Sequence, residues 1–166
     1  MKSSFLSAAV WLCAFVVLAG GLQAAVAADV TLSGGPWLRN VSRVDLDHGA
    51  GSDFRSPLDV DVLIATLSVS NTLGSNWSLR IACETNEAGW PPGLTIAVRR
   101  SGGWDESGLS DGTSYRALTP DLQTLFSGAG DYSTIQILMR VDGLSARMSP
   151  GSYELSIRYV IETGGP

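Results

Sequence analysis

The sequence has very few of the residues that usually carry catalysis or hold transition metals. It contains one histidine, His48, and two cysteines, Cys13 and Cys83. A zinc site built from Cys and His needs about four ligands, so these residues are too few for one. A serine or cysteine nucleophile would need His48 as its base, and the chain has no G-x-S-x-G elbow. The composition therefore predicts a non-enzymatic protein without a cofactor.

Lysine is also nearly missing, because Lys2 is the only one in the chain. The other cations are ten arginines, and the chain has sixteen Asp and Glu residues. Arg99 and Arg100 are the only adjacent pair, so the sequence has no cluster of positive charge of the kind that binds nucleic acid or an anionic membrane. We therefore expect neither among its partners.

A long apolar run occurs only at the N-terminus. Lys2 precedes this run, and the small residues Ala25, Val26 and Ala27 follow it. The order is typical of a secretory signal peptide, and the apolar core is shorter than the roughly 20 residues of a spanning helix. We expect residues 1–27 to be removed and the rest to be exported to the periplasm, the cell surface or the extracellular space. A retained membrane anchor is the alternative.

Loss of the signal peptide would leave Cys83 as the one cysteine of the mature chain. An intramolecular disulfide is then excluded. Cys83 is in register with Trp77, Leu79 and Ile81, which indicates the inward face of a strand, where a free thiol behaves as a small apolar side chain. Pairing between two chains is the alternative, and it requires an exposed Cys83.

Alternation of apolar and polar residues, the pattern of a half-buried β-strand, recurs along the chain. It is clearest in residues 152–161, which Pro150 and Gly151 precede. Further strands are predicted near residues 58–69, 77–84, 94–98 and 135–141. Residues 29–32 form either an edge strand or a loose arm. The apolar residues of the 152–161 strand are Tyr153, Leu155, Ile157, Tyr159 and Ile161.

Two segments depart from simple alternation. The apolar phase of the 58–69 run slips at Leu63, which predicts a β-bulge or a strand covered on both faces. Pro120–Phe126 has helical spacing with Thr119 as a possible N-cap, so one or two helical turns are expected there.

About seven strands, separated by Gly, Pro, Ser and Asp turns and accompanied by at most one short helix, predict an all-β fold. We expect residues 28–166 to form one immunoglobulin-like antiparallel β-sandwich. The Cys…Trp…Cys pattern of antibody domains is missing, so the expected likeness is architectural.

Residues 76–81 (NWSLRI) with the following Gly/Pro loop, and residues 149–159 (SPGSYELSIRY), resemble parts of bacterial pilin-like and spore-coat-like secreted β-sandwich domains. In chaperone–usher pilins of this kind the domain lacks its final strand, and an N-terminal arm of the next subunit fills the gap by β-strand addition. The resemblance implies a structural or surface-interaction module, such as a fimbrial subunit or adhesion component. Its partners would be other copies of itself or related subunits. The candidate arm at residues 29–32 is short, and the paired cysteines of many such pilins are absent.

A calcium-binding module is one alternative function. Asp45, Asp47 and Asp53 lie in the densest polar cluster, with glycines between them. The Asp45-x-Asp47 pair resembles the start of a calcium loop, but no Asp stands at the next alternate position and no Glu closes the loop. A solvated acidic loop explains the same residues.

A carbohydrate-binding module is another alternative, with glycans as partners. Trp90 and Trp104 lie in expected loops, where exposed aromatic faces beside Asp and Arg could stack on sugar rings. Packing of these side chains over the ends of the sandwich core explains the same positions.

Overall fold

The computed structural model describes residues 6–8, 28–85, 90–101 and 108–164. These residues form β-strands and a single 3-10 turn, η1 (Arg43–Asp45). The predicted all-β fold is confirmed. In chain order the strands are β1 (Leu6–Ala8), β2 (Asp29–Ser33), β3 (Trp37–Arg39), β4 (Val62–Ser70), β5 (Asn76–Thr85), β6 (Thr95–Arg100), β7 (Arg116–Ala117), β8 (Gln123–Ala129), β9 (Tyr132–Asp142) and β10 (Leu155–Thr163).

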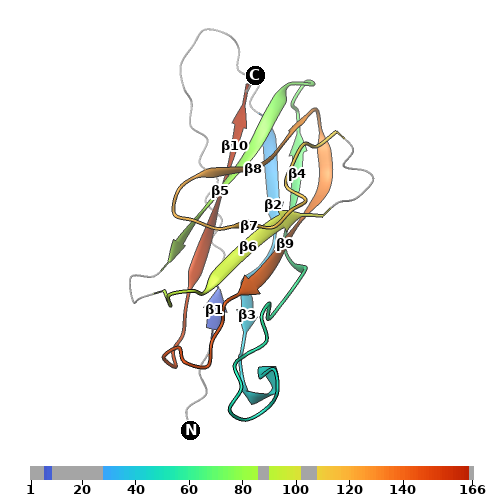
Figure 1. Ribbon diagram of the computed structural model, residues 1–166. Coiled ribbons are helices and arrows are strands. Elements are labelled where there is room, and N and C mark those ends of the chain that lie inside the picture. The colour runs from blue at the N-terminus through green and yellow to red at the C-terminus, as the bar shows by residue number, and fades with distance from the viewer. Residues whose placement is uncertain (1–5, 9–27, 86–89, 102–107, 165–166) are drawn as a thin grey trace.

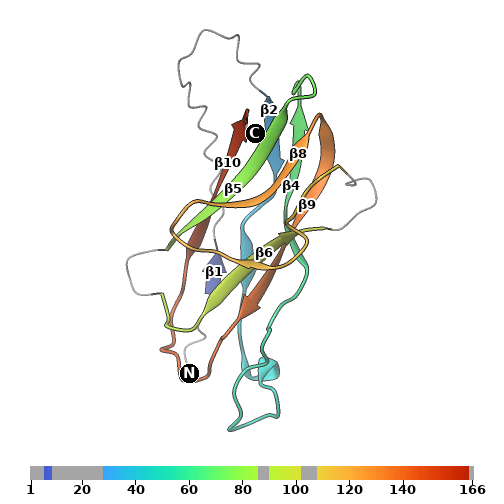
Figure 2. The same ribbon diagram turned by 45° about the horizontal axis from the view of Figure 1, so that its top comes forward.

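Two antiparallel sheets form the sandwich. One is three-stranded with the order β10-β5-β8, and the other is five-stranded with the order β2-β4-β9-β6-β7. Most strands run along the length of an elongated molecule, as Figures 1 and 2 show. The predicted antiparallel β-sandwich is confirmed, and residues 29–32 belong to an edge strand, β2, which pairs with β4. A separate ladder joins β1 to β3, and β1 lies within the predicted signal peptide.

The core lies between the two sheets around Trp77. Its indole packs edge-on against the rings of Phe126 and Tyr132, with centroid distances of 6.0 and 5.9 Å. The indole N–H donates to the carbonyl of Gly130 at 2.8 Å, so the one polar atom of this buried side chain is satisfied. The largest fully buried apolar side chains are Trp77, Phe126, Leu67, Leu79, Ile81, Leu125, Ile135, Ile137, Val69, Val98 and Val141.

The predicted helix at Pro120–Phe126 is wrong, because the segment leads into strand β8. Phe126 lies opposite Leu79 and Thr124 lies opposite Arg80, which leaves Leu125 as an extra residue in a β-bulge. Leu125 and Phe126 are both fully buried. The bulge therefore places two consecutive apolar residues in the core, and this spacing imitated that of a helix.

The slip predicted in the 58–69 run is confirmed as an irregularity in β4. Its register with β9 shifts between Leu63 and Ala65, and again between Leu67 and Val69. Cys83 is a buried free thiol, as the inward register of β5 predicted. Burial raises the pKa of this thiol, which disfavours the reactive thiolate.

Candidate functional site

The two lateral sides of the sandwich, where the sheet edges meet, differ in how they are covered. The closed side lies at β7 and β8, where residues 108–122 join the two sheets. Ser110 and Ser127 exchange backbone hydrogen bonds of 2.8 and 3.1 Å along the outer edge of β8. The backbone N–H of Leu118 donates to the carbonyl of Ile96 in β6 at 2.8 Å. Some of the edge backbone groups on this side therefore have partners within the chain.

Arg100, at the end of β6, fixes the loop that closes this side. The residue is only 6% exposed. Its guanidinium donates to the carbonyls of Asp111 at 2.6 Å and Leu109 at 3.2 Å, and its Cζ lies 6.0 Å from the centroid of the Phe126 ring. The buried charge is thus satisfied by loop carbonyls, which holds the loop against the core.

The open side lies at β2 and β10, the opposite edges of the two sheets. β10 is nine residues long and pairs with β5 along its whole length. Within the sheets of the part of the chain that the structure describes, no strand is hydrogen-bonded to its other edge. β1 comes close to β10, but it belongs to the predicted signal peptide and so not to the predicted mature domain. The outer edge of β10 therefore carries backbone N–H and C=O groups without a sheet partner.

Apolar side chains on the inner face of β2 are incompletely covered. Val30 lies opposite Val69, and Leu32 lies opposite Leu67. Residues directly opposite one another in a ladder point to the same face, so Val30 and Leu32 face the core like their buried partners. Val30 is nevertheless 37% exposed, and Leu32 is only partly buried.

The same holds on β10. Tyr159 lies opposite Ile81 and Ile161 lies opposite Leu79, and both partners are fully buried. Tyr159 and Ile161 themselves are only partly buried. We define the open-side residues as Val30, Leu32, Tyr159 and Ile161.

The strand order accounts for this incomplete cover. An immunoglobulin-type sandwich pairs strands A, B, E and D in one sheet and strands C, F and G in the other. Here β2-β4-β9-β6 match the first sheet, and β5 and β10 match C and F in the same chain order. Strand G, which would lie beside β10, has no counterpart in the two described sheets.

Tyr159 has an unsatisfied polar atom. Although part of the residue is exposed, its hydroxyl oxygen is buried and has no hydrogen-bond partner. Burial raises the pKa of the phenol, so the hydroxyl stays neutral and can both donate and accept a hydrogen bond. A buried hydroxyl without a partner costs about 1–3 kcal/mol.

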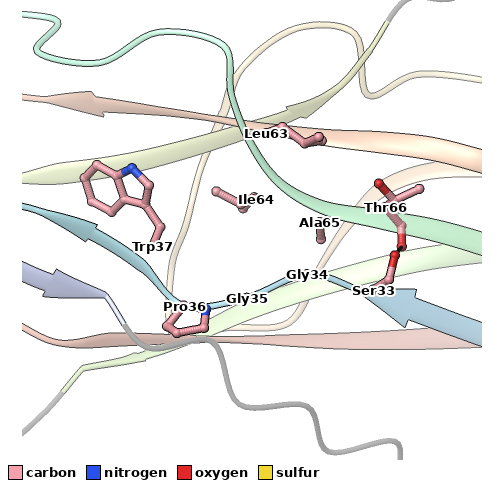
Figure 3. Close-up of a pocket in the computed structure, with 9 residues that line it drawn as sticks. All are labelled: Ser33, Gly34, Gly35, Pro36, Trp37, Leu63, Ile64, Ala65 and Thr66. Atoms are coloured by element: carbon pink, nitrogen blue, oxygen red, sulfur yellow. Dashed lines mark hydrogen bonds between the residues drawn. The ribbon is translucent and has the colours of Figure 1, made fainter.

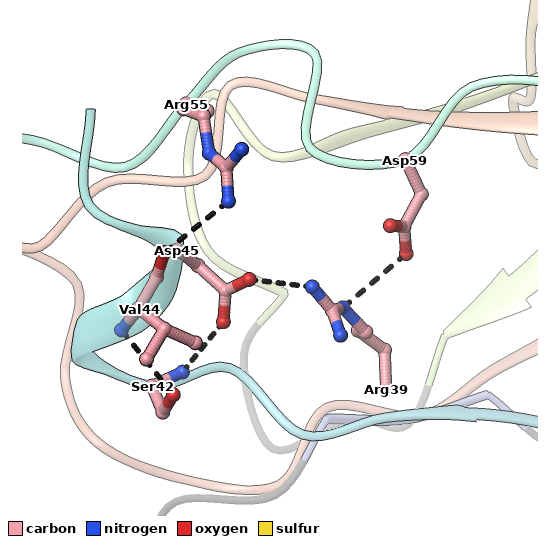
Figure 4. A network of polar contacts seen from close by, with 6 residues as sticks. All are labelled: Arg39, Ser42, Val44, Asp45, Arg55 and Asp59. Carbon is pink, nitrogen blue, oxygen red and sulfur yellow. Dashed lines mark hydrogen bonds and ion pairs between the residues drawn. The ribbon is translucent and has the colours of Figure 1, made fainter.

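The structure does not bring the three calcium candidates together. Asp45 is 2% exposed and pairs with Arg39 at 2.5 Å, while its second oxygen accepts the backbone N–H of Ser42 at 2.9 Å (Figure 4). Asp47 pairs with His48 at 2.8 Å.

The third candidate, Asp53, serves a different loop. It accepts the backbone N–H of Ala146 at 2.6 Å and the hydroxyl of Ser145 at 2.9 Å, and these bonds lower its pKa. Among the residues that the structure describes, no group of three or more His, Cys, Asp or Glu side chains is placed to hold a metal. The carboxylates tie loops to the domain instead.

The predicted ligand-binding tryptophans are placed only in part. Trp90 is half-buried against the core, and its indole N–H donates to the carbonyl of Leu94 at 2.7 Å. Trp104 lies outside the described residues. His48 has an 83% exposed side chain, so it is not held in a site.

A hollow of about 420 Å³ lies beside the link between β2 and β3. In Figure 3 the lining residues come from two segments, the link from Ser33 to Trp37 and the start of β4 from Leu63 to Thr66. A Cβ on Gly34 would approach the carbonyl oxygen of Ile64 to 2.5 Å, so only glycine allows this close backbone contact. None of its nine lining residues is charged, so the hollow carries no acid–base chemistry. They are Ser33, Gly34, Gly35, Pro36, Trp37, Leu63, Ile64, Ala65 and Thr66.

Comparison with protein-family models, with curated proteins and with solved structures finds no match for this chain. No helix among the described residues has the length and apolar character needed to cross a membrane. The open side is therefore the candidate functional site, although the sequence did not mark its residues as a site. The alternation in residues 29–32 and 152–161 was visible, but a missing neighbour of β10 is a property of the assembled sheets.

Proposed function

We propose that this chain is an exported, non-enzymatic structural subunit that binds an extended segment of another subunit by β-strand addition along β10. The observation that carries the proposal is the free outer edge of β10 beside the incompletely covered open-side residues. This combination supports the fimbrial-type function that the sequence resemblance implies.

The chemistry of the open side defines the segment that would fit it. Free N–H and C=O groups along β10 need an extended backbone as their partner. The inner face needs apolar side chains on alternate residues of that segment, because successive side chains of a strand point to opposite faces. Such a segment would cover Val30, Leu32 and Ile161 and occupy the position of strand G.

The proposal can be tested with residues 28–166 and a synthetic peptide. The probe is a nine-residue peptide that alternates valine with serine and lysine, which matches the length of β10. Val30→Arg places a charge on the inner face of β2. Thr31→Arg is the matched control, because Thr31 is exposed on the same strand and points to the other face.

We expect the wild-type chain and Thr31→Arg to bind the peptide, measured by fluorescence anisotropy, and Val30→Arg to lose at least about tenfold in affinity, because the charge would be buried without a partner. Hydrogen exchange of β10 amides should slow on binding. Absence of binding by the folded wild-type chain, or equal losses in the two variants, would overturn the proposal.

A further inference from the structure

We infer that the Tyr159 hydroxyl is a specificity-determining contact of the open side, and that it selects an incoming strand with a hydrogen-bonding side chain at one otherwise apolar position. This inference rests on the proposed strand addition and adds a chemical requirement to it. It starts from the one open-side residue that carries an unsatisfied polar atom.

Position makes Tyr159 a neighbour of any strand added to β10. It lies in the middle of β10, opposite Ile81 of β5, and faces the core with Leu155 and Ile157. A strand added on the other edge would place its own inward side chains about 5 Å from the Cβ of Tyr159, or one step along the diagonal. A side chain of moderate length from that strand can then reach the phenol.

Energetics also point to a partner outside the described domain. Phenylalanine would fill the same apolar space without the penalty of an unsatisfied hydroxyl. Its nearest neighbours on the same face of β10, Ile157 and Ile161, are aliphatic, as is Leu155. The tyrosine hydroxyl is therefore a cost to the isolated domain that a partner in the bound state can remove.

The Tyr159 hydroxyl should favour strands that offer it a hydrogen bond over strands that do not. A strand with a hydrogen-bonding group opposite Tyr159 gains a bond in a site shielded from water. A strand with only apolar side chains leaves the hydroxyl unsatisfied. The open side should thus accept many alternating apolar strands weakly and one polar pattern more tightly.

The test uses the same nine-residue valine peptide as the probe. Each valine is replaced in turn by glutamine and, as a size control, by methionine, since the two side chains have nearly the same length and only glutamine forms hydrogen bonds well. At one position we expect wild-type residues 28–166 to favour glutamine over methionine about five- to tenfold more than at the other positions. Tyr159→Phe should abolish that preference.

Stability of the unbound domain gives the second readout. Tyr159→Phe should leave the melting temperature unchanged or raise it. The control Tyr153→Phe should lower it, because the Tyr153 hydroxyl donates to the carbonyl of Ser149. Tyr153→Phe should also keep the glutamine preference.

The experiments distinguish failure of this inference from failure of the proposed strand addition. If the parent peptide binds but no glutamine position is preferred, or the preference survives in Tyr159→Phe, the inference is wrong and strand addition stands. A clear drop in the melting temperature of Tyr159→Phe would also overturn it, because the hydroxyl would then be satisfied inside the domain. If no peptide binds, the proposed function fails together with the inference.

Discussion

The closed and open sides of this sandwich differ in whether the backbone groups at their sheet edges are covered. An edge strand presents unpaired backbone groups, and proteins usually cover or interrupt such edges. On the closed side, residues 108–122 return over the edge of β8, and Arg100 fixes them through loop carbonyls. On the open side, β10 has nine residues and, within the described sheets, no strand on its outer edge.

The two sides therefore differ in whether the chain itself covers the edge of the sheet. On the open side the inward residues Val30 and Leu32 of β2 are incompletely covered. At the opposite edge of the three-stranded sheet, residues 108–122 of the same chain lie along β8. An edge that the chain closes serves stability, and we attribute to the uncovered edge a role in binding.

The largest contrast between the two sides should come from glycine substitutions. Gly112 on the closed side has a φ of +78°, and a Cβ there would approach the Cβ of Phe126 to 2.8 Å. Gly35, in the link that follows β2, would place a Cβ with no atom within 4 Å. We expect Gly112→Ala to lower the free energy of unfolding by about 2–3 kcal/mol, and Gly35→Ala to change it by less than about 0.5 kcal/mol.

Urea unfolding followed by tryptophan fluorescence measures both glycine variants on residues 28–166. Peptide binding supplies the control, because Gly112→Ala should still bind the valine peptide when folded. Equal destabilisation by the two alanines would mean that the link after β2 is packed as tightly as the closed side, which would contradict the expected difference.

Valine truncation gives a smaller contrast with identical chemistry at both sites. Val98 of β6 is fully buried, whereas Val30 of β2 is 37% exposed. Removing two methyl groups from a closed core costs their transfer free energy and leaves a cavity. We expect Val98→Ala to cost about 2 kcal/mol of unfolding free energy and Val30→Ala about 0.5 kcal/mol.

The same urea experiment, with and without bound peptide, sharpens this contrast. The valine peptide should cover Val30, so Val30→Ala should weaken peptide binding more than Val98→Ala does. A larger effect of Val98→Ala on binding would place the peptide elsewhere on the domain.

Sequence alternation predicted much of this architecture because the strands are half-buried. The inward residues of β5, from Trp77 to Cys83, followed the two-residue period closely, and so did those of β9. The bulge at Leu125 led to the wrong prediction of a helix at Pro120–Phe126, because two consecutive buried residues of a strand match helical spacing. Local patterns record which face of a strand is buried and leave out which strand lies next to it.

The candidate sites were harder to predict than the strands, because closeness in sequence does not show which side chains the fold brings together. Asp45, Asp47 and Asp53 are close in sequence, but the fold gives each carboxylate its own donors. Residues 29–32 and 152–161 are far apart in sequence, and the strand order sets them on the same side of the sandwich. The unsatisfied Tyr159 hydroxyl could not be predicted, because tyrosine is a common inward residue of strands.

The smallest expected effect concerns an end of the sandwich and tests whether the contrast between its sides is independent of pH. The Asp131 carboxylate accepts the backbone N–H of buried Thr72 at 3.0 Å and its hydroxyl at 2.7 Å, which lowers the pKa of Asp131. A lowered folded-state pKa stabilises the domain above the ordinary aspartate pKa of about 4. That contribution is lost as the pH falls through the folded-state value.

Urea unfolding at pH 6 and pH 3 therefore should show a smaller acid-induced loss of stability in Asp131→Asn than in the wild-type chain. Part of the loss should remain in the variant, because hydrogen bonds also lower the pKa values of Asp53 and Asp61. The stability difference between Val98→Ala and Val30→Ala should be the same at both pH values, since no titrating group enters it. Two results together would contradict this expectation: a smaller difference between Val98→Ala and Val30→Ala at pH 3, and an equal acid-induced loss of stability in Asp131→Asn and the wild-type chain. Protonation would then act on the packing of the two sides and not on the Asp131 contact.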